Sequence, residues 1–157
     1  MKKNNHGHQR QRNSSKPWIR KVDFVFYNEE EIRLSVLEAR NTAASAPVIR
    51  NASGISDPTA REAIYNLTPL PTVTISGQAL TLPERWITVI DKTYAWAQKQ
   101  SPTGLHYEVA RRRYSGEDYR VTCRELHIST TTLHRIIENI KIYAALQAAQ
   151  FGLIYIE

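Results

Sequence analysis

The segment ISTTTLHR, residues 128–135, places hydroxyl, imidazole and guanidinium groups within eight consecutive positions. Threonine can hydrogen-bond a base or a phosphate and offer its methyl group to thymine, and arginine can bind guanine through two parallel hydrogen bonds. Serine is also a strong N-cap, so the same segment is typical of an ordinary helix start. The surrounding elements must decide whether this helix start recognises a nucleic acid.

The sequence lacks the residue patterns that a catalytic or metal site requires. A catalytic site needs paired carboxylates, a nucleophile beside a base, a metal cluster or a glycine-rich phosphate loop. The six glycines form no such loop, the five histidines show no metal-ligand spacing, and the single cysteine, Cys123, excludes an internal disulfide and a thiolate cluster. We therefore expect a protein that is not an enzyme and that uses no cofactor or metal.

The net charge of +6 is unevenly distributed. Seven of the 21 lysines and arginines lie in residues 1–21, which contain no acidic residue, so the rest of the chain is close to neutral. Residues 1–17 are poor in apolar side chains, and we predict a basic tail that is disordered when free. Such a tail is either a solvated end without a partner or an arm that follows phosphates without reading their sequence.

A chain of 157 residues with 41% hydrophobic residues suffices for one compact domain or two small ones. No run of 18 apolar residues is present, and the first twenty residues lack the apolar core of a signal peptide. We therefore expect no membrane association and a cytoplasmic location.

Residues 18–104 are predicted to form a mainly helical N-terminal region. The apolar residues of segment 18–27 are too dense for a tail, but their pattern is ambiguous between a strand and a helix start. Asn28 and the three glutamates that follow it indicate an N-cap and the first turn of a helix, which continues through residue 41.

Three further elements are expected in the second part of this region. Asp57 and Pro58 open a short helix over residues 58–65. Alternation around Ser76 and Gly77 predicts a small β-hairpin over residues 72–81. The last element is a helix over residues 84–100, opened by a capping box between Thr81 and Glu84.

Residues 105–157 are predicted to form a helix-turn-helix region. A helix from residue 105 precedes Ser115, which we expect to cap a short helix through residue 126. His127 and Ile128 then form a turn. Ser129 caps a longer helix whose apolar residues recur at spacings of three and four. A short helix, a tight turn and a longer helix with a small polar start define the outline of a helix-turn-helix.

The finer spacing agrees with this outline. A helix-turn-helix needs a small residue where the helices approach, an apolar residue three positions later, one in the turn, and two on the second helix facing back. These roles fall to Cys123, Leu126, Ile128, Leu133 and Ile136. Two positions depart from the pattern, because a histidine, residue 127, occupies the turn position where glycine is common and a threonine, residue 122, occupies a position that is usually apolar. Histidine tolerates the left-handed backbone region better than most residues.

The spacing predicts which side chains remain on the solvent face of the second helix. They would meet the major groove of double-stranded DNA, and they are Thr130, Thr131, His134, Arg135 and Glu138. The alternative is a plain helical hairpin whose second helix happens to begin with a serine cap.

Four segments occur in an order that resembles a group of phage and prophage regulators: ISDPTAREAI (55–64), PERWITVID (83–91), RRRYSGEDYRVTCRELHIS (111–129) and TTTLHRII (130–137). Over about residues 22–145 the chain resembles the RinA/ArpU-like activators of phage late-gene transcription, whose C-terminal part is similar to region 4 of sigma-70 factors. The most specific pieces are the SDPTAREAI segment and the spacing from Tyr114 to the serine-capped helix.

The resemblance implies a DNA-binding transcriptional regulator in the cytoplasm of a bacterial host, which activates late phage genes together with host RNA polymerase. It places Ser129, Thr130, Thr131, His134 and Arg135 in a recognition helix, and Arg120 and Arg124 in a supporting helix beside the phosphates. The alternative is a phage DNA-packaging protein resembling a small terminase subunit, or a structural interaction protein. These alternatives differ in stoichiometry, because a packaging ring requires an extensive self-association surface.

The last helix should continue to Gly152, which ends it. Residues 153–157, LIYIE, are apolar and β-prone, so we expect them to fold back as a strand against the hairpin or to offer an edge to a second chain. A homodimer through this edge is a hypothesis. The predicted fold is thus mainly α, with a helical N-terminal half, a C-terminal helix-turn-helix and a minor β-hairpin.

Overall fold

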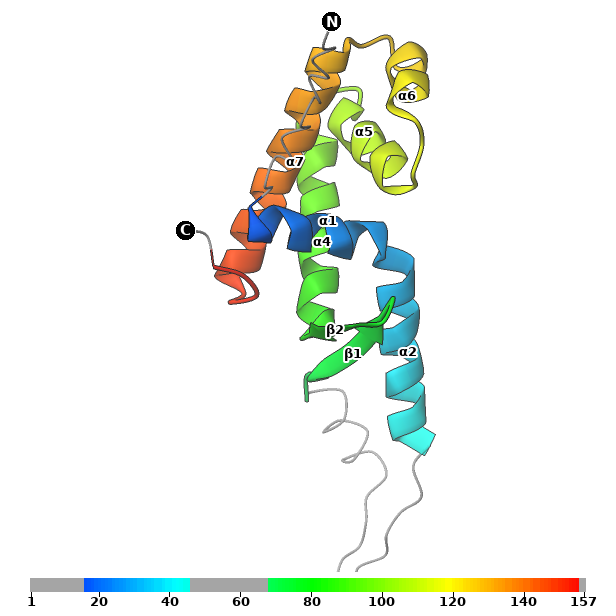
Figure 1. Ribbon diagram of the computed structural model, residues 1–157, viewed down its shortest axis with the longest axis vertical. Helices are drawn as coiled ribbons and strands as arrows, with labels where there is room; N and C mark the ends of the chain where they lie inside the picture. Colours follow the sequence, from blue (N-terminus) through cyan, green and yellow to red (C-terminus); the bar gives the residue numbers. More distant parts are fainter. Residues whose placement is uncertain (1–15, 46–67, 156–157) are drawn as a thin grey trace, which may run out of the picture.

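The computed structural model describes residues 16–45 and 68–155, and in these ranges the chain is mainly helical with one two-stranded antiparallel sheet (Figure 1). The elements are α1 (Pro17–Tyr27), α2 (Glu29–Ser45), β1 (Thr72–Ile75), β2 (Gln78–Thr81), α4 (Pro83–Lys99), α5 (Leu105–Tyr114), α6 (Tyr119–Glu125) and α7 (Thr130–Gln150). The predicted mainly α fold with a minor hairpin is confirmed. The predicted helix over residues 58–65 and most of the basic tail lie outside the described residues.

The first apolar segment is helical and not extended. In α1 the buried residues Val22, Val25 and Phe26 recur at helical spacing and point to the core. Asn28 precedes α2 as predicted, but its side chain is used elsewhere. Its amide nitrogen donates to Phe24 O at 2.7 Å, which closes α1, and its oxygen accepts from the Ser76 hydroxyl at 3.0 Å.

The predicted hairpin is confirmed, and its turn explains its register. Ser76 and Gly77 both have positive φ angles, 45° and 75°, as a two-residue hairpin turn of the favoured twist requires. The turn pairs Val73 with Leu80 across the strands, and both side chains are buried. The carboxylate of Glu31 accepts hydrogen bonds from the backbone N–H and the hydroxyl of Ser76, both at 2.8 Å, which fixes the hairpin to α2.

The predicted capping box at the start of α4 is wrong. Leu82, and not Thr81, is the N-cap residue, and it adopts a left-handed conformation (φ 50°) without a side-chain cap. The carboxylate of Glu84 is held by other partners, since it accepts from Arg40 Nε at 2.9 Å and from Leu70 N–H at 3.0 Å. The helix nevertheless begins where expected, because Pro83 occupies a first-turn position at which its missing donor costs nothing.

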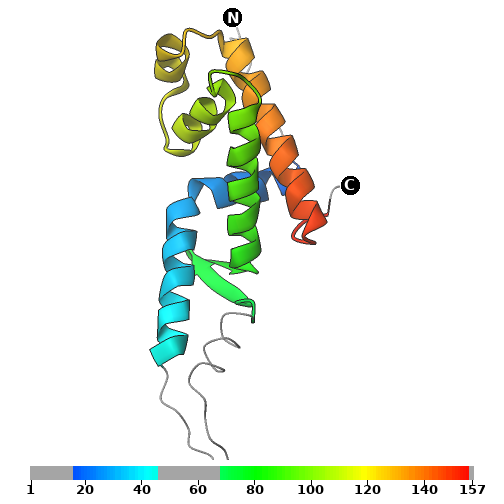
Figure 2. The same cartoon turned by 180° about the vertical axis from the view of Figure 1, so that it is seen from behind.

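The long helices α4 and α7 form the central helix pair of the molecule. They lie side by side in opposite directions, and α1 crosses them on one face (Figure 1; Figure 2). Trp86 and Ile90 of α4 join Ile140 of α7 in one apolar cluster that also includes residues of α1 and of the hairpin. The predicted N-terminal and C-terminal regions therefore share a core. None of the described helices combines the length and apolarity that a membrane span requires.

The end of α7 is as predicted, but the strand after it is not. Gly152 has a φ angle of 69° and ends the helix, with Leu153 N–H donating back to Ala148 O at 2.9 Å. Residues 153–155 form no strand, and within the described residues β1 pairs only with β2. Ile154 is buried in the core cluster and Leu153 packs against it, so the segment folds back through apolar side chains and not through backbone pairing.

Candidate nucleic-acid interface

The observed N-cap of the short helix α6 lies three residues after the predicted one. Asp118 is the N-cap residue, and its carboxylate accepts from Arg120 N–H at 2.7 Å. The predicted cap Ser115 instead donates its hydroxyl to Arg112 O at 2.9 Å and helps to close α5. The prediction of Ser115 as the cap is therefore wrong, although the predicted helix is present.

The turn between α6 and α7 has the predicted conformation. His127 has a φ angle of 52°, and Ile128 N–H donates to Cys123 O at 3.0 Å, which closes the turn. A left-handed backbone costs a residue other than glycine about 1–2 kcal/mol, which the packing around the turn must offset. Ser129 caps α7, since its hydroxyl oxygen accepts from Thr132 N–H at 3.1 Å.

The five apolar positions of the predicted helix-turn-helix all pack inward. Leu133 and Ile136 of α7 are buried, with 2% and 3% of their surface exposed. Cys123, Leu126 and Ile128 are half-buried and pack against the same core cluster. The predicted inward face of the unit is therefore confirmed.

Thr122 departs from the apolar pattern, but its hydroxyl has a partner. The residue is 2% exposed, and its Oγ1 donates to Glu117 Oε2 at 2.7 Å. This hydrogen bond, together with those from Arg112, holds the pKa of Glu117 below its ordinary value. A hydroxyl at this position thus links the interior of α6 to the loop before it, so the exception causes no unsatisfied polar group.

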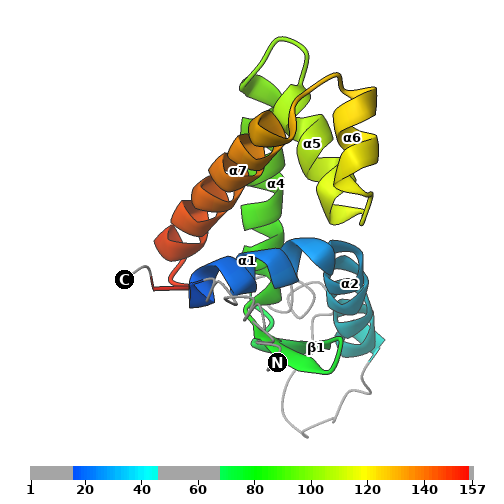
Figure 3. The same cartoon turned by 45° about the horizontal axis from the view of Figure 1, so that its top comes forward.

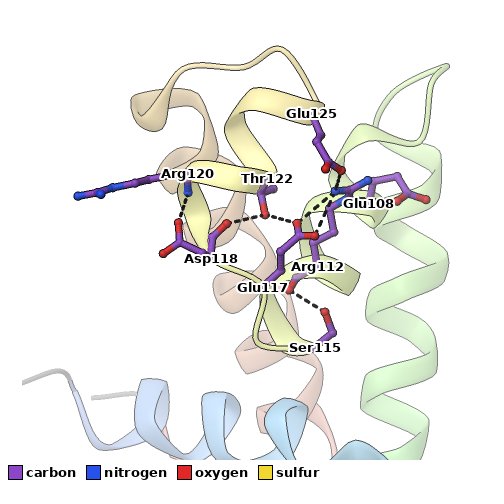
Figure 4. A network of polar contacts seen from close by, with 8 residues as sticks. All are labelled: Glu108, Arg112, Ser115, Glu117, Asp118, Arg120, Thr122 and Glu125. Atoms are coloured by element: carbon purple, nitrogen blue, oxygen red, sulfur yellow. Dashed lines mark hydrogen bonds and ion pairs between the residues drawn. The ribbon is translucent and has the colours of Figure 1, made fainter.

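The guanidinium of Arg112 connects three segments of the chain. Its Nη1 donates to Glu125 Oε2 of α6 at 2.5 Å and to Glu117 Oε2 of the preceding loop at 3.1 Å, while its Nε lies 3.9 Å from Glu108 on α5 (Figure 4). These contacts hold α6 on the end of α5. This network was not predicted from the sequence. Its signal was a run of three arginines just before Gly116, with Glu117 and Glu125 after it.

The side chains predicted to bind DNA occupy the first turns of α7 and the outer side of α6. Within the described residues, only Ser129 and Arg120 of this set use their side chains in hydrogen bonds. Ser129 is exposed and serves as the cap of α7. Arg120 donates from Nε to the hydroxyl of Tyr119 at 3.2 Å. The exposed predicted residues are Thr130, Thr131, His134, Arg135 and Glu138 on α7, and Arg120 and Arg124 on α6.

These residues do not all face the same way. His134 and Glu138 line a pocket of about 240 Å³ between α5, α6 and α7, together with Arg113 and Tyr119. Arg135 lies on another side of α7, close enough to His106 to contribute, after burial, to lowering the pKa of that imidazole. Residues 131 and 135 are one helical turn apart and form the outward stripe.

The charges around this stripe are unequal. The acidic side chains of Asp118, Glu117 and Glu125 are engaged in the cap and in the Arg112 network. Within the described residues the side chains of Arg124 and Arg135 have neither an ion pair nor a hydrogen bond. The available positive charge is therefore on the exposed guanidinium groups, where phosphates and base edges could reach them.

No protein-family model, curated protein or solved structure matches the chain. Within the described residues, no group of three or more histidine, cysteine, aspartate or glutamate side chains is placed to hold a metal ion. The assignment of a function therefore depends on the geometry of α6, the turn and α7.

Proposed function

We propose that this protein binds double-stranded DNA in a sequence-specific manner, with the first turns of α7 in the major groove and α6 beside the phosphate backbone. The observation that carries the proposal is the exposed stripe of Thr131 and Arg135 on a helix whose start is fixed by the Ser129 cap and by the closed turn at His127. Side chains that a rigid element positions lose little conformational freedom on binding.

The position of α7 supports this docking mode. Its N-terminus lies at one end of the molecule, where the supporting helix and the turn between α4 and α5 also lie (Figure 3). The major groove is about 12 Å wide and admits one α-helix. The positive end of the helix dipole also favours an approach of α7 to phosphates.

The more specific proposal is transcriptional activation of phage late genes together with host RNA polymerase, in the cytoplasm of a bacterial cell. Its support is the resemblance of residues 22–145 to the RinA/ArpU-like activators, with the helix-turn-helix at the corresponding place in the chain. In vitro transcription from a promoter that carries the DNA site bound by this protein would test the proposed activation. Unchanged transcription on adding the protein would contradict activation but not DNA binding.

A packaging or structural protein is the second candidate, and one observation favours it. Ile142 and Leu146, one turn apart on α7, are 44% and 51% exposed, which is an apolar surface suited to self-association. Light scattering on the purified protein distinguishes the candidates. A stable ring of many copies would favour packaging, whereas a monomer or dimer agrees with a regulator.

The first experiment is selection from a random-sequence duplex pool, followed by gel-shift titration of the enriched and scrambled duplexes at two salt concentrations. We expect one enriched site that remains preferentially bound at the higher salt. If binding is equal on all duplexes and is lost with salt, only sequence-independent phosphate binding remains and the proposal is wrong.

A pair of arginine variants sharpens the test. Arg135→Ala should relax sequence preference at one base-pair position by about 1–3 kcal/mol, because the lost contact is to a base edge. Arg124→Ala should weaken binding to all duplexes alike, because its contact is to a phosphate. Titration of both variants against every single substitution of the selected site measures the two effects. A uniform loss for Arg135→Ala would show that this arginine does not read a base.

A further inference from the structure

Two aromatic contacts show how α4 lies along α7. The ammonium of Lys92 lies 4.9 Å from the centroid of the Phe151 ring, and the rings of Trp96 and Tyr143 stack at 4.4 Å with an angle of 9° between their planes. The later residue of α4 thus contacts the earlier residue of α7. The helices are antiparallel, and the turn that follows α4, residues 100–104, lies near the first turns of α7 (Figure 3).

The α4 helix and the α6 helix contact different sides of α7. His134 lines the pocket shared with Tyr119 of α6, whereas Tyr143 faces Trp96 of α4. These two residues of α7 are nine positions apart, which at about 100° per residue corresponds to half a turn around the helix. The exposed stripe that contains Arg135 is therefore flanked by α6 on one side and by the end of α4 on the other.

The α4–α5 turn has a fixed conformation. The hydroxyl oxygen of Ser101 accepts from Leu105 N–H at 2.8 Å, and Gly104 N–H donates to Ser101 O at 3.1 Å. The imidazole of His106, in the first turn of α5, lies edge-on to the ring of Trp96, with 6.3 Å between the ring centroids. This contact joins the start of α5 to the same tryptophan that stacks on Tyr143 of α7. A partner that binds this turn does not have to order it first.

The chemistry of the turn is that of a phosphate-binding surface. Residues 98–107, QKQSPTGLHY, contain a lysine and no acidic residue. Lys99 is exposed and has no ion pair within the described residues, and the amide of Gln100 and the hydroxyl of Thr103 are exposed beside it. Lysine, glutamine and threonine side chains are among those that contact the DNA backbone without reading its sequence.

We propose that the α4–α5 turn, together with Lys99 at the end of α4, is a second DNA-contacting element, which binds the phosphate backbone at the edge of the groove that α7 enters, with Lys99 as the principal charge. This inference rests on the proposed function, because it assigns a further contact to the same complex. Arg124 on α6 and Lys99 then both contact phosphates beside the groove that α7 enters.

The test is the salt dependence of binding to the selected duplex for Lys99→Ala, with Lys92→Ala as the matched control. Lys92 is exposed on the same helix but contacts Phe151 near the other end of α7. One lost phosphate contact should make the slope of log K against log salt concentration shallower by about 0.9, and should weaken binding about fivefold near physiological salt. Lys92→Ala should leave both quantities unchanged, and Lys99→Arg should restore them.

The outcomes separate this inference from the proposed function. If the wild-type protein selects a site but Lys99→Ala keeps its slope, the turn does not contact phosphate and only this inference is wrong. An equal loss in Lys92→Ala would also overturn it, because the effect would then reflect net charge alone. Thermal melting of each variant detects a merely structural role of Lys99 at the end of α4, for which the melting temperature would fall without a change of slope. Failure of the wild-type protein to bind any duplex would overturn both proposals.

Discussion

The two ends of the molecule use arginine in opposite ways. At the hairpin end, Arg40 binds the carboxylate of Glu84 and the carbonyl of Thr68, and Arg33 binds the carboxylates of two neighbouring acidic residues. At the α6–α7 end, Arg124 and Arg135 are exposed without such partners in the part of the chain that the structure describes. An arginine held by carboxylates stabilises the fold, whereas one left in solvent remains available for a ligand.

Arg112 shows that the difference follows from partners and not from place. It lies at the α6–α7 end, yet three carboxylates surround it and fix it between α5 and α6 (Figure 4). Within one end of the molecule, a structural arginine therefore supports α6, the helix that carries the available Arg124. Substitutions at the two kinds of position should separate stability from DNA affinity.

The largest effect is expected at the hairpin end. Glu84→Ala should lower the free energy of unfolding by about 2–3 kcal/mol, because it removes a charged partner of the half-buried Arg40 and the acceptor of Leu70 N–H. Denaturant unfolding measures the change. The control Glu38→Ala alters an exposed carboxylate on α2 and should change stability by less than about 0.5 kcal/mol. Equal losses for the two variants would contradict the structural role of the Arg40 pair.

A smaller effect is expected for the supporting network. Arg112→Met keeps the aliphatic stem but removes the bonds to Glu117 and Glu125, and it should lower the free energy of unfolding by less than Glu84→Ala does, since these groups are partly exposed and solvent screens them. Arg124→Met should not affect stability, although both variants should weaken DNA binding. Chemical denaturation and gel-shift titration of the same samples give the two quantities. Loss of stability in Arg124→Met alone would reverse the comparison.

The smallest effect concerns the two predicted caps, one at each end. Ser129→Ala should cost about 1 kcal/mol, because it removes the acceptor of Thr132 N–H at the start of α7. Thr81→Ala should cost close to nothing as a cap, because Leu82 occupies the N-cap position of α4. Thermal melting of the two variants compares them directly. An equal cost would mean that the hydroxyl of Thr81 stabilises the start of α4 after all.

Periodicity and cap residues predicted α2, α4, α5, α6, α7 and the hairpin, because each depends on residues close in sequence, but they left α1 ambiguous between a strand and a helix. The errors arose where two local solutions compete. Thr81 and Ser115 are both good caps by residue type, but Leu82 and Asp118 take the N-cap positions, and long-range bonds from α2 hold the carboxylate expected in the capping box. The predicted strand after α7 failed because Ile154 reaches the core through its side chain, which satisfies the same apolar pattern.

The candidate site was predictable only in part. The order of small, apolar and capping residues from Cys123 to Ile136 determined the inward face, and with it the solvent face by exclusion. The division of that face was not predictable, because it depends on where α5 lies and on the pocket that His134 faces. The nearness of the α4–α5 turn to α7 depends on the stacking of Trp96 on Tyr143, which are far apart in sequence.

The salt bridge between Asp23 of α1 and Lys141 of α7, at 2.8 Å, joins residues 118 positions apart. During synthesis α1 therefore leaves the ribosome well before α7, and until α7 emerges its buried Phe26 can pack only against intervening residues such as Tyr94 of α4 and Tyr114 of α5. The contact between α1 and α7 therefore closes late in folding, because it cannot form before α7 has been synthesised.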